Sequence, residues 1–161
     1  METLEAYCIV KNDILEALTS GNSWLREDYE FMKTQPLDKA VYKIDQCLHS
    51  ILQGWKDKLD LYSILIYCLS QSPQALVPTM ETLHKTVIKK NADYGDSFYK
   101  LHQCMPFAYK VRLFDKVSRL KTLSEKKVAS VEDESILDTM LDLANYCMLE
   151  LAARIMNGKE N

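Results

Sequence analysis

The sequence contains little glycine and proline, with four residues of each among 161. All-β folds built on tight turns, and Rossmann-type enzymes with a glycine-rich phosphate loop, normally need more of both. The chain also lacks the phosphate-loop pattern G-x-x-x-x-G-K-S/T and the zinc pattern H-E-x-x-H. These absences argue against three classes: turn-rich β proteins, Rossmann-type enzymes and phosphate-loop enzymes.

An excess of one charge, paired cysteines and long apolar runs are missing as well. Basic and acidic residues number 20 and 23, so the net charge is only -3 and direct binding to duplex nucleic acid is not expected. The most apolar window, Leu59–Leu69, contains Asp60 and is too short to span a membrane. No two of the five cysteines form C-x-x-C, and no secretory signal is visible. We therefore expect free thiols and a cytoplasmic location.

Helical periodicity is what the sequence does contain, with apolar residues three, four and seven positions apart. It predicts helices over about 3–18, 23–33, 37–53, 55–70, 78–91, 106–123 and 130–156, and Asp96 or Ser97 can cap another after a turn at 91–97. The predicted fold is an all-α bundle of about seven or eight helices. Pro73 and Pro78 suggest that the chain divides into a first region of unassigned role, residues 1–72, and a second region, residues 73–161.

Three carboxylates on the last predicted helix are the strongest chemical signal. Glu134, Asp138 and Asp142 are spaced four apart, so they form one narrow strip beside a broad apolar face, with Asn145 on the same strip. Like charges at this spacing repel one another, and no lysine stands among them. Stacked carboxylates suit Mg²⁺, which prefers oxygen ligands. The alternative is a solvated acidic face near a helix N-terminus, which would not account for Asp142.

Basic residues precede this helix in the chain. Arg112, Lys116 and Arg119 lie within about 100° of Asp115 on the helix over 106–123. They could meet phosphate oxygens while Asp115 joins the acidic strip, because the arginine fork matches phosphate geometry. An ordinary surface of weak ion pairs is the alternative.

The predicted turn at 91–97 gathers further polar groups. Lys90 directly precedes the turn, and Asp93 and Tyr94 lie within it and add a carboxylate and an aromatic ring. A helix that starts near Ser97 could receive an anion at its N-terminus. An ordinary corner between two helices would explain the same residues.

Three segments in this order resemble a known family: KNADYGDSF at 90–98, VRLFDKVSRL at 111–120 and DESILDTMLDLANY at 133–146. The resemblance is to the nucleotide modification associated domain 1 family, small helical proteins of phages and bacteria, and spans about residues 78–156. It implies a role in making, salvaging or hydrolysing deoxynucleotides, in the cytoplasm of a bacterium or a phage-infected host.

The last helix is also similar in style to the all-α nucleotide pyrophosphatases of the MazG and dimeric dUTPase group. Those enzymes hold Mg²⁺ against a triphosphate with carboxylates from two adjacent helices. Their E-x-x-E pair has no counterpart here, because residues 78–91 contain only Glu81. Asp93 or Asp115 would have to supply the second set of ligands.

The function predicted from these signals is a Mg²⁺-dependent deoxynucleotide hydrolase that acts as a homodimer or higher homo-oligomer. The metal ligands would be Glu134, Asp138 and Asp142, with Asp115, Glu134 and Asp138 in catalytic roles. Nucleotide binding would fall to Lys90, Asp93, Tyr94, Arg112, Lys116, Arg119, Asn145 and Tyr146, with Phe98 as a further stacking candidate. Two alternatives remain open at this point: a nucleotide-binding module without catalysis, and a structural helical protein without a small ligand.

Overall fold

The computed structural model describes residues 1–20, 22–54, 57–94, 96–126 and 134–158, and for Tyr94 and Glu134 it describes only the backbone. These ranges contain eight helices and no strand, which confirms the predicted all-α class. The helices are α1 (Thr3–Thr19), α2 (Trp24–Lys33), α3 (Leu37–Gln53), α4 (Lys58–Ser70), α5 (Leu76–Tyr94), α6 (Ser97–Cys104), α7 (Ala108–Ser124) and α8 (Glu134–Met156).

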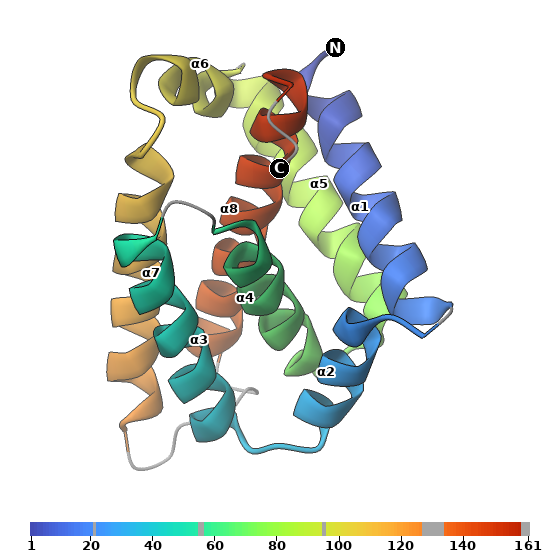
Figure 1. The fold of residues 1–161 in the computed structure, drawn as a ribbon, viewed down its shortest axis with the longest axis vertical. Coiled ribbons are helices and arrows are strands. Elements are labelled where there is room, and N and C mark those ends of the chain that lie inside the picture. The colour runs from blue at the N-terminus through green and yellow to red at the C-terminus, as the bar shows by residue number, and fades with distance from the viewer. Residues whose placement is uncertain (21, 55–56, 95, 127–133, 159–161) are drawn as a thin grey trace.

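Helices α4 and α8 form the centre of the bundle (Figure 1). Helices α3 and α7 pack together on one side of this pair, α1 and α5 pack together on the other, and α6 lies across one end. The central position of α4 follows from its composition, because every residue from Ile64 to Ser70 is buried. A helix that is apolar on all faces must be covered on all faces.

Local polar contacts explain where several helices begin and end. Ser23 caps α2 as expected, since its Oγ accepts a hydrogen bond of 3.1 Å from the Arg26 amide. At the other end of α2, the buried Gln71 side chain donates to the carbonyl oxygens of Met32 and Gln35 at 3.0 and 3.1 Å. These bonds join the end of α4 to the end of α2.

The predicted boundaries after residue 73 are less accurate. Helix α5 begins at Leu76 and continues to Tyr94, so residues 91–94 are helical and the predicted turn is shorter than expected. Pro78 lies inside its first turn, where a missing amide hydrogen is tolerated. Helix α7 begins at Ala108, two residues after Pro106. Asp96 precedes α6 without a side-chain capping bond, and Ser130 lies outside the described residues.

One continuous core joins helices from both parts of the chain. Buried residues of α1, α3 and α4 belong to the same apolar cluster as those of α5, α7 and α8. All five cysteines are free, as predicted. No helix in the described part of the chain is both long enough and apolar enough to cross a membrane.

Candidate functional site

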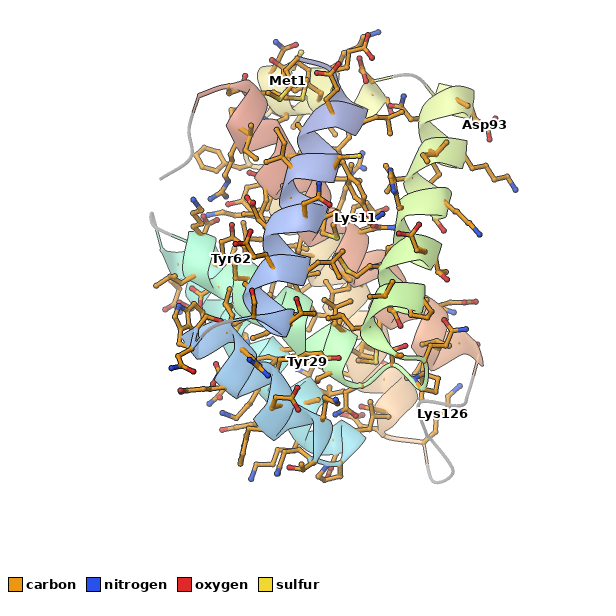
Figure 2. The ribbon with its side chains drawn as sticks, turned by 90° about the vertical axis from the view of Figure 1, so that its right-hand side faces the viewer. Met1, Lys11, Tyr29, Tyr62, Asp93 and Lys126 are labelled. Atoms are coloured by element: carbon orange, nitrogen blue, oxygen red, sulfur yellow. The ribbon has the colours of Figure 1, made fainter. Side chains whose placement is uncertain are left out.

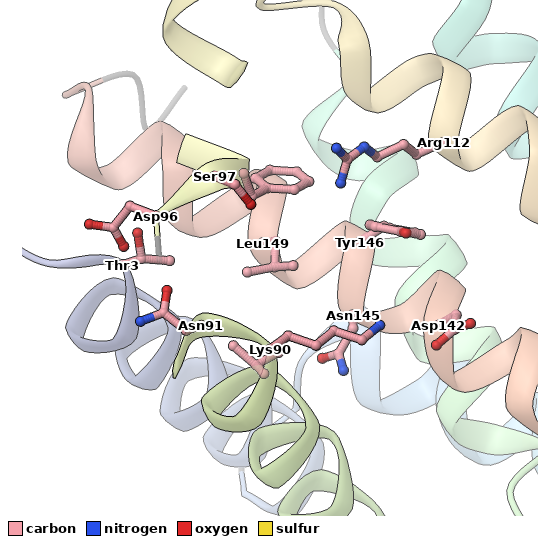
Figure 3. A pocket seen from close by; sticks show the side chains of 12 residues that line it. Thr3, Lys90, Asn91, Asp96, Ser97, Arg112, Asp142, Asn145, Tyr146 and Leu149 are labelled. Carbon is pink, nitrogen blue, oxygen red and sulfur yellow. The ribbon is translucent and has the colours of Figure 1, made fainter. Parts of the chain in front are cut away.

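A cavity of about 330 Å³ opens between α5, α6, α7 and α8, and the start of α1 closes one side of it (Figure 3). We call it the α5–α8 cavity. Twelve residues line it: Thr3, Val87, Lys90, Asn91, Asp96, Ser97, Phe98, Arg112, Asp142, Asn145, Tyr146 and Leu149. Six of the twelve were named from the sequence: Lys90, Arg112, Asp142, Asn145 and Tyr146 as site residues, and Phe98 as a stacking candidate. They come from four different helices, so the fold brings together residues that the sequence separates by up to 56 positions.

Arg112 is held against two aromatic rings at the wall of this cavity. Its guanidinium carbon lies 5.2 Å from the centroid of Phe98 and 5.5 Å from that of Tyr146. The two rings are themselves stacked, with centroids 6.4 Å apart and planes inclined by 22°. Contact with ring faces stabilises a cation and limits its movement. The arginine is therefore positioned by α6 and α8 although it belongs to α7.

A lysine from α5 approaches the same space. Lys90 is exposed, and its side chain extends across the cavity toward Asn145 (Figure 3). Together with Arg112 it gives the cavity two cations, carried on helices that face one another. An anion entering this space would meet these two cations, beside the carboxylates of Asp96 and Asp142 in the same lining.

Asn145 forms the floor and is fully engaged in the core. Its Oδ1 accepts a hydrogen bond of 2.7 Å from the Tyr7 hydroxyl, and its Nδ2 donates to the Leu83 carbonyl at 3.2 Å. These contacts tie α8 to α1 and α5, the helices on either side of the cavity. Asn145 thus holds the cavity walls together, and its predicted contact with a nucleotide stays a prediction.

The end of the cavity nearest the N-terminus carries small polar side chains. Thr3, Asn91 and Asp96 gather there, with Ser97 close by (Figure 3). Thr3 is buried, and its hydroxyl oxygen has no hydrogen-bond partner in the described structure. Sequence reasoning missed Thr3 because residues 1–72 carried no motif, and only the packing of α1 against α8 brings it to the site.

The acidic strip is only partly at this cavity. Of its members, Asp142 lines the cavity, but Lys116 from α7 binds its Oδ2 at 3.1 Å. A lysine from the neighbouring helix therefore reaches the acidic strip, although none stands within the strip on α8. That Lys116 binds phosphate stays a prediction. Asp138 is exposed outside the cavity lining, and the Glu134 side chain lies outside the described residues.

Three other predicted residues also lie away from the cavity. Asp93 is exposed near the outer end of α5 (Figure 2), and Asp115 is exposed on α7. Arg119 is exposed as well, and its Nε donates to Thr139 Oγ1 at 3.1 Å. The Tyr94 side chain is outside the described residues. Within the described ranges, no three His, Cys, Asp or Glu side chains are close enough to hold a metal ion together.

A second polar cluster, which the sequence did not suggest, lies on the other side of α6 and α7. Asp57 is 3% exposed and Glu150 is 1% exposed, and Arg154 bridges the two carboxylates at 2.6 and 2.7 Å. The Tyr109 hydroxyl also donates to Asp57. His102 lies 3.3 Å from Glu150. We call these five residues the Asp57–Glu150 network.

The electrostatics of the two carboxylates differ. Burial alone would raise the pKa of Asp57, but hydrogen bonds from Arg154 and Tyr109 outweigh it and hold this pKa below its usual value. Burial dominates at Glu150 and raises the pKa of its carboxyl above the usual value, although Arg154 and His102 oppose the effect. Sequence signals for this network were weak, since Glu150 stands alone within an apolar stretch of α8 and its partners are distant in the chain.

Comparison with known proteins supports the resemblance noted above. Residues 90–153 match the family model described as nucleotide modification associated domain 1. This matched segment covers the last part of α5, all of α6 and α7, and most of α8. No curated protein and no solved structure matched the chain. The matched segment supplies ten of the twelve residues of the α5–α8 cavity, all except Thr3 and Val87.

Proposed function

We propose that the α5–α8 cavity binds a deoxynucleotide. The observation that carries this proposal is the arginine clamped against two aromatic rings in a cavity formed almost entirely by the matched nucleotide modification associated segment. Arginine presents a planar fork of donors that fits phosphate oxygens in pairs. The aromatic rings that hold it could stack on a base, and such stacking accepts any of the bases because each has an aromatic face.

The roles of the residues follow from their positions. Arg112 and Lys90 would neutralise the phosphate, because they approach the cavity from opposite helices. Tyr146 and Phe98 would supply the aromatic wall for the base. Thr3 would close the end of the cavity beside Asn91 and Asp96. Asn145 would act as a positioning residue through its bonds to Tyr7 and Leu83.

A catalytic form of the proposal adds Mg²⁺-dependent hydrolysis of the bound nucleotide. The residues for the metal would be Asp142, Asp138 and Glu134, which share one face of α8. The described residues fit this role only in part, since Lys116 binds Asp142 and Asp138 is exposed. Mg²⁺ would supply charge neutralisation and an activated water, whereas the binding proposal needs only the residues of the cavity.

Calorimetric titration with deoxynucleoside mono-, di- and triphosphates tests the binding proposal. We expect saturable binding of at least one of these ligands, and at least about tenfold weaker binding in Arg112→Ala, which loses a charge-assisted bidentate contact. Arg119→Ala is the matched control, because Arg119 is a guanidinium of the same helix outside the cavity. Equal weakening by both substitutions, or no binding by the wild type, would refute the proposal.

Product analysis with the same ligands and Mg²⁺ tests the catalytic form. Turnover that is lost in Asp138→Ala, with binding retained, would support it. Binding without turnover would leave the protein as a nucleotide-binding module.

A further inference from the structure

A cluster of polar side chains joins α1 to α5, away from the sites described above. Cys8 and Lys11 come from α1, and Glu81 and His84 come from α5. The two residues on each helix are three positions apart, so they lie on one face and meet in the seam between the helices (Figure 2). We call these four residues the Cys8–His84 cluster. None of them lines the α5–α8 cavity, so the nucleotide proposal does not explain them.

The four side chains form a continuous series of contacts. Lys11 Nζ donates to Glu81 Oε1 at 2.7 Å and lies 3.0 Å from His84 Nδ1. The other ring nitrogen, Nε2, lies 3.6 Å from Cys8 Sγ. The His84 ring is also stacked on Tyr7, with centroids 5.4 Å apart and planes inclined by 30°. The ring is therefore held with one nitrogen facing an ammonium group and the other facing a sulfur atom.

These contacts determine where the His84 proton lies. The Lys11 ammonium is paired with Glu81, and its hydrogen bond lowers the pKa of that carboxyl. An ammonium group can only donate, so Nδ1 of His84 must accept. Burial and the charge of Lys11 lower the pKa of the His84 ring, which is therefore uncharged at neutral pH. A neutral ring that accepts at Nδ1 carries its proton on Nε2, so an N–H group points at Cys8 Sγ.

A donor directed at a cysteine sulfur has a chemical consequence. The thiolate, and not the thiol, is the form of cysteine that attacks electrophiles. An N–H group bonds a charged sulfur more strongly than a neutral one, because the bond is then charge-assisted. The His84 ring therefore supports the sulfur of Cys8 in its nucleophilic form, and the Lys11 ammonium behind the ring fixes the proton that makes this bond.

The cluster lies at the surface rather than in the core. Cys8 and His84 are half-buried, and the side chain of Glu81 is 50% exposed. Lys11 is more covered, with 11% of its side chain exposed. A partly exposed sulfur beside basic groups is the usual setting of a reactive cysteine, whereas a buried structural cysteine is inert.

The other four cysteines lack this combination. Cys68 and Cys147 are buried, and burial raises the pKa of both thiols well above the usual value. Burial also raises the pKa of Cys47, to about 11. Cys104 is exposed at the end of α6. Among the five sulfurs, all of them in the described ranges, only that of Cys8 contacts a histidine ring.

We propose that Cys8 is a modification site, at which hydrogen peroxide oxidises the thiol to a sulfenic acid. The sulfur attacks one peroxide oxygen, so an S–O bond forms while the O–O bond breaks. The departing hydroxide takes up the proton that the thiol has released and leaves as water. Sulfur loses two electrons and the peroxide gains two. A small, uncharged oxidant suits a sulfur that is half-buried between two helices.

Peroxide treatment of the full chain, with dimedone present to trap sulfenic acids, tests the proposal by peptide mass spectrometry. We expect Cys8 to be trapped at least about tenfold faster than Cys104 at neutral pH, which is the effect of one charge-assisted hydrogen bond. Exposure alone predicts the opposite order, because Cys104 is the more exposed of the two. Trapping of Cys104 as fast as Cys8, or faster, would overturn the proposal. This comparison within one chain needs no variant.

Substitutions of His84 test its role as the donor. His84→Leu removes the N–H group and should slow trapping of Cys8 about tenfold, whereas His84→Gln keeps an N–H donor and should stay within about threefold of the wild type. The rate at Cys104 should be unchanged in both variants. If His84 only packed the seam, His84→Leu would loosen it and speed the reaction of Cys8. An unchanged or faster rate at Cys8, or an equal loss at Cys104, would refute the role of His84.

The oxidation test is independent of the nucleotide proposal. If the wild type is trapped first at Cys8 but binds no deoxynucleotide, only the nucleotide proposal fails. If it binds a deoxynucleotide but Cys8 is not trapped ahead of Cys104, only the modification site is overturned.

Discussion

Single residues in this protein act through partners on other helices, and Arg112 is the clearest case. It belongs to α7, is stacked on rings from α6 and α8, and faces a cavity whose second cation comes from α5. The sequence predicted that Arg112 belongs to a site, and its phosphate role remains a proposal. Its neighbours were not predictable, because the ring contacts depend on how three helices pack.

Replacing Arg112 by lysine separates charge from shape. Lysine keeps the positive charge but lacks the planar fork and the broad contact with the rings of Phe98 and Tyr146. We expect Arg112→Lys to bind the preferred deoxynucleotide about tenfold more weakly than the wild type in a calorimetric titration. Arg119→Lys should bind normally. Full affinity in Arg112→Lys would mean that charge alone is recognised.

Asp57 should contribute strongly to stability at neutral pH. Its carboxylate is buried between Arg154 and Tyr109, so Asp57→Asn leaves the guanidinium without one charged partner. Removing one member of a buried ion pair lowers the free energy of unfolding by about 3 kcal/mol. Asp45→Asn, which affects a pair with the partly exposed Lys121 at 3.2 Å, should cost less than about 1 kcal/mol.

The difference in stability between the wild type and Asp57→Asn depends on pH in a defined direction. Because the pKa of Asp57 is lowered in the folded state, its stabilisation is complete above the unfolded pKa, near 4, and declines as the pH falls through the folded pKa. Urea titrations should therefore show the gap between wild type and Asp57→Asn narrowing below about pH 4. A gap that widens on acidification would contradict the assignment.

At the scale of whole helices, periodicity and capping residues located most elements. Helix α3 occupies its predicted range, 37–53, because apolar spacing and Gly54 mark it clearly. Glycine is favoured at this position for a steric reason, since a Cβ there would lie 2.9 Å from the Ser50 carbonyl oxygen. Helix α5 was predicted too short because 91–94 contain typical turn residues, whereas these residues continue the helix to Tyr94.

The cap of α2 allows a test at this scale. Ser23 accepts from the Arg26 amide and donates to the Ala17 carbonyl at 2.8 Å, so it joins the end of α1 to the start of α2. Ser23→Ala should lower the free energy of unfolding by about 1 kcal/mol in urea denaturation. Ser23→Asp can still accept from the amide and should recover part of this loss. An unchanged free energy of unfolding in Ser23→Ala would show that the cap does not contribute to stability.

Across the whole molecule, the two parts of the chain share one core and one site. Buried residues of α1 and α4 pack on α8, and Thr3 reaches the cavity formed by the matched segment. The sequence alone suggested a boundary at 73–78, because prolines mark that stretch. Packing between residues more than 100 positions apart cannot be inferred from such local signals.

Coincident unfolding transitions are the expected consequence. Both tryptophans, Trp24 and Trp55, are in the first 72 residues, so their fluorescence reports that part, whereas circular dichroism reports all helices. We expect the two signals to give the same urea midpoint, as for a single cooperative unit. Midpoints that differ clearly would support two independently folding regions.

The account as a whole depends on the nucleotide occupying the α5–α8 cavity. The most direct measurement is a crystal structure of the protein grown with saturating concentrations of the deoxynucleotide that titration shows to bind best. The account predicts its phosphate within hydrogen-bonding distance of Arg112 and Lys90, and its base beside Tyr146. A nucleotide bound elsewhere, with Arg112 still stacked over an empty cavity, would contradict it.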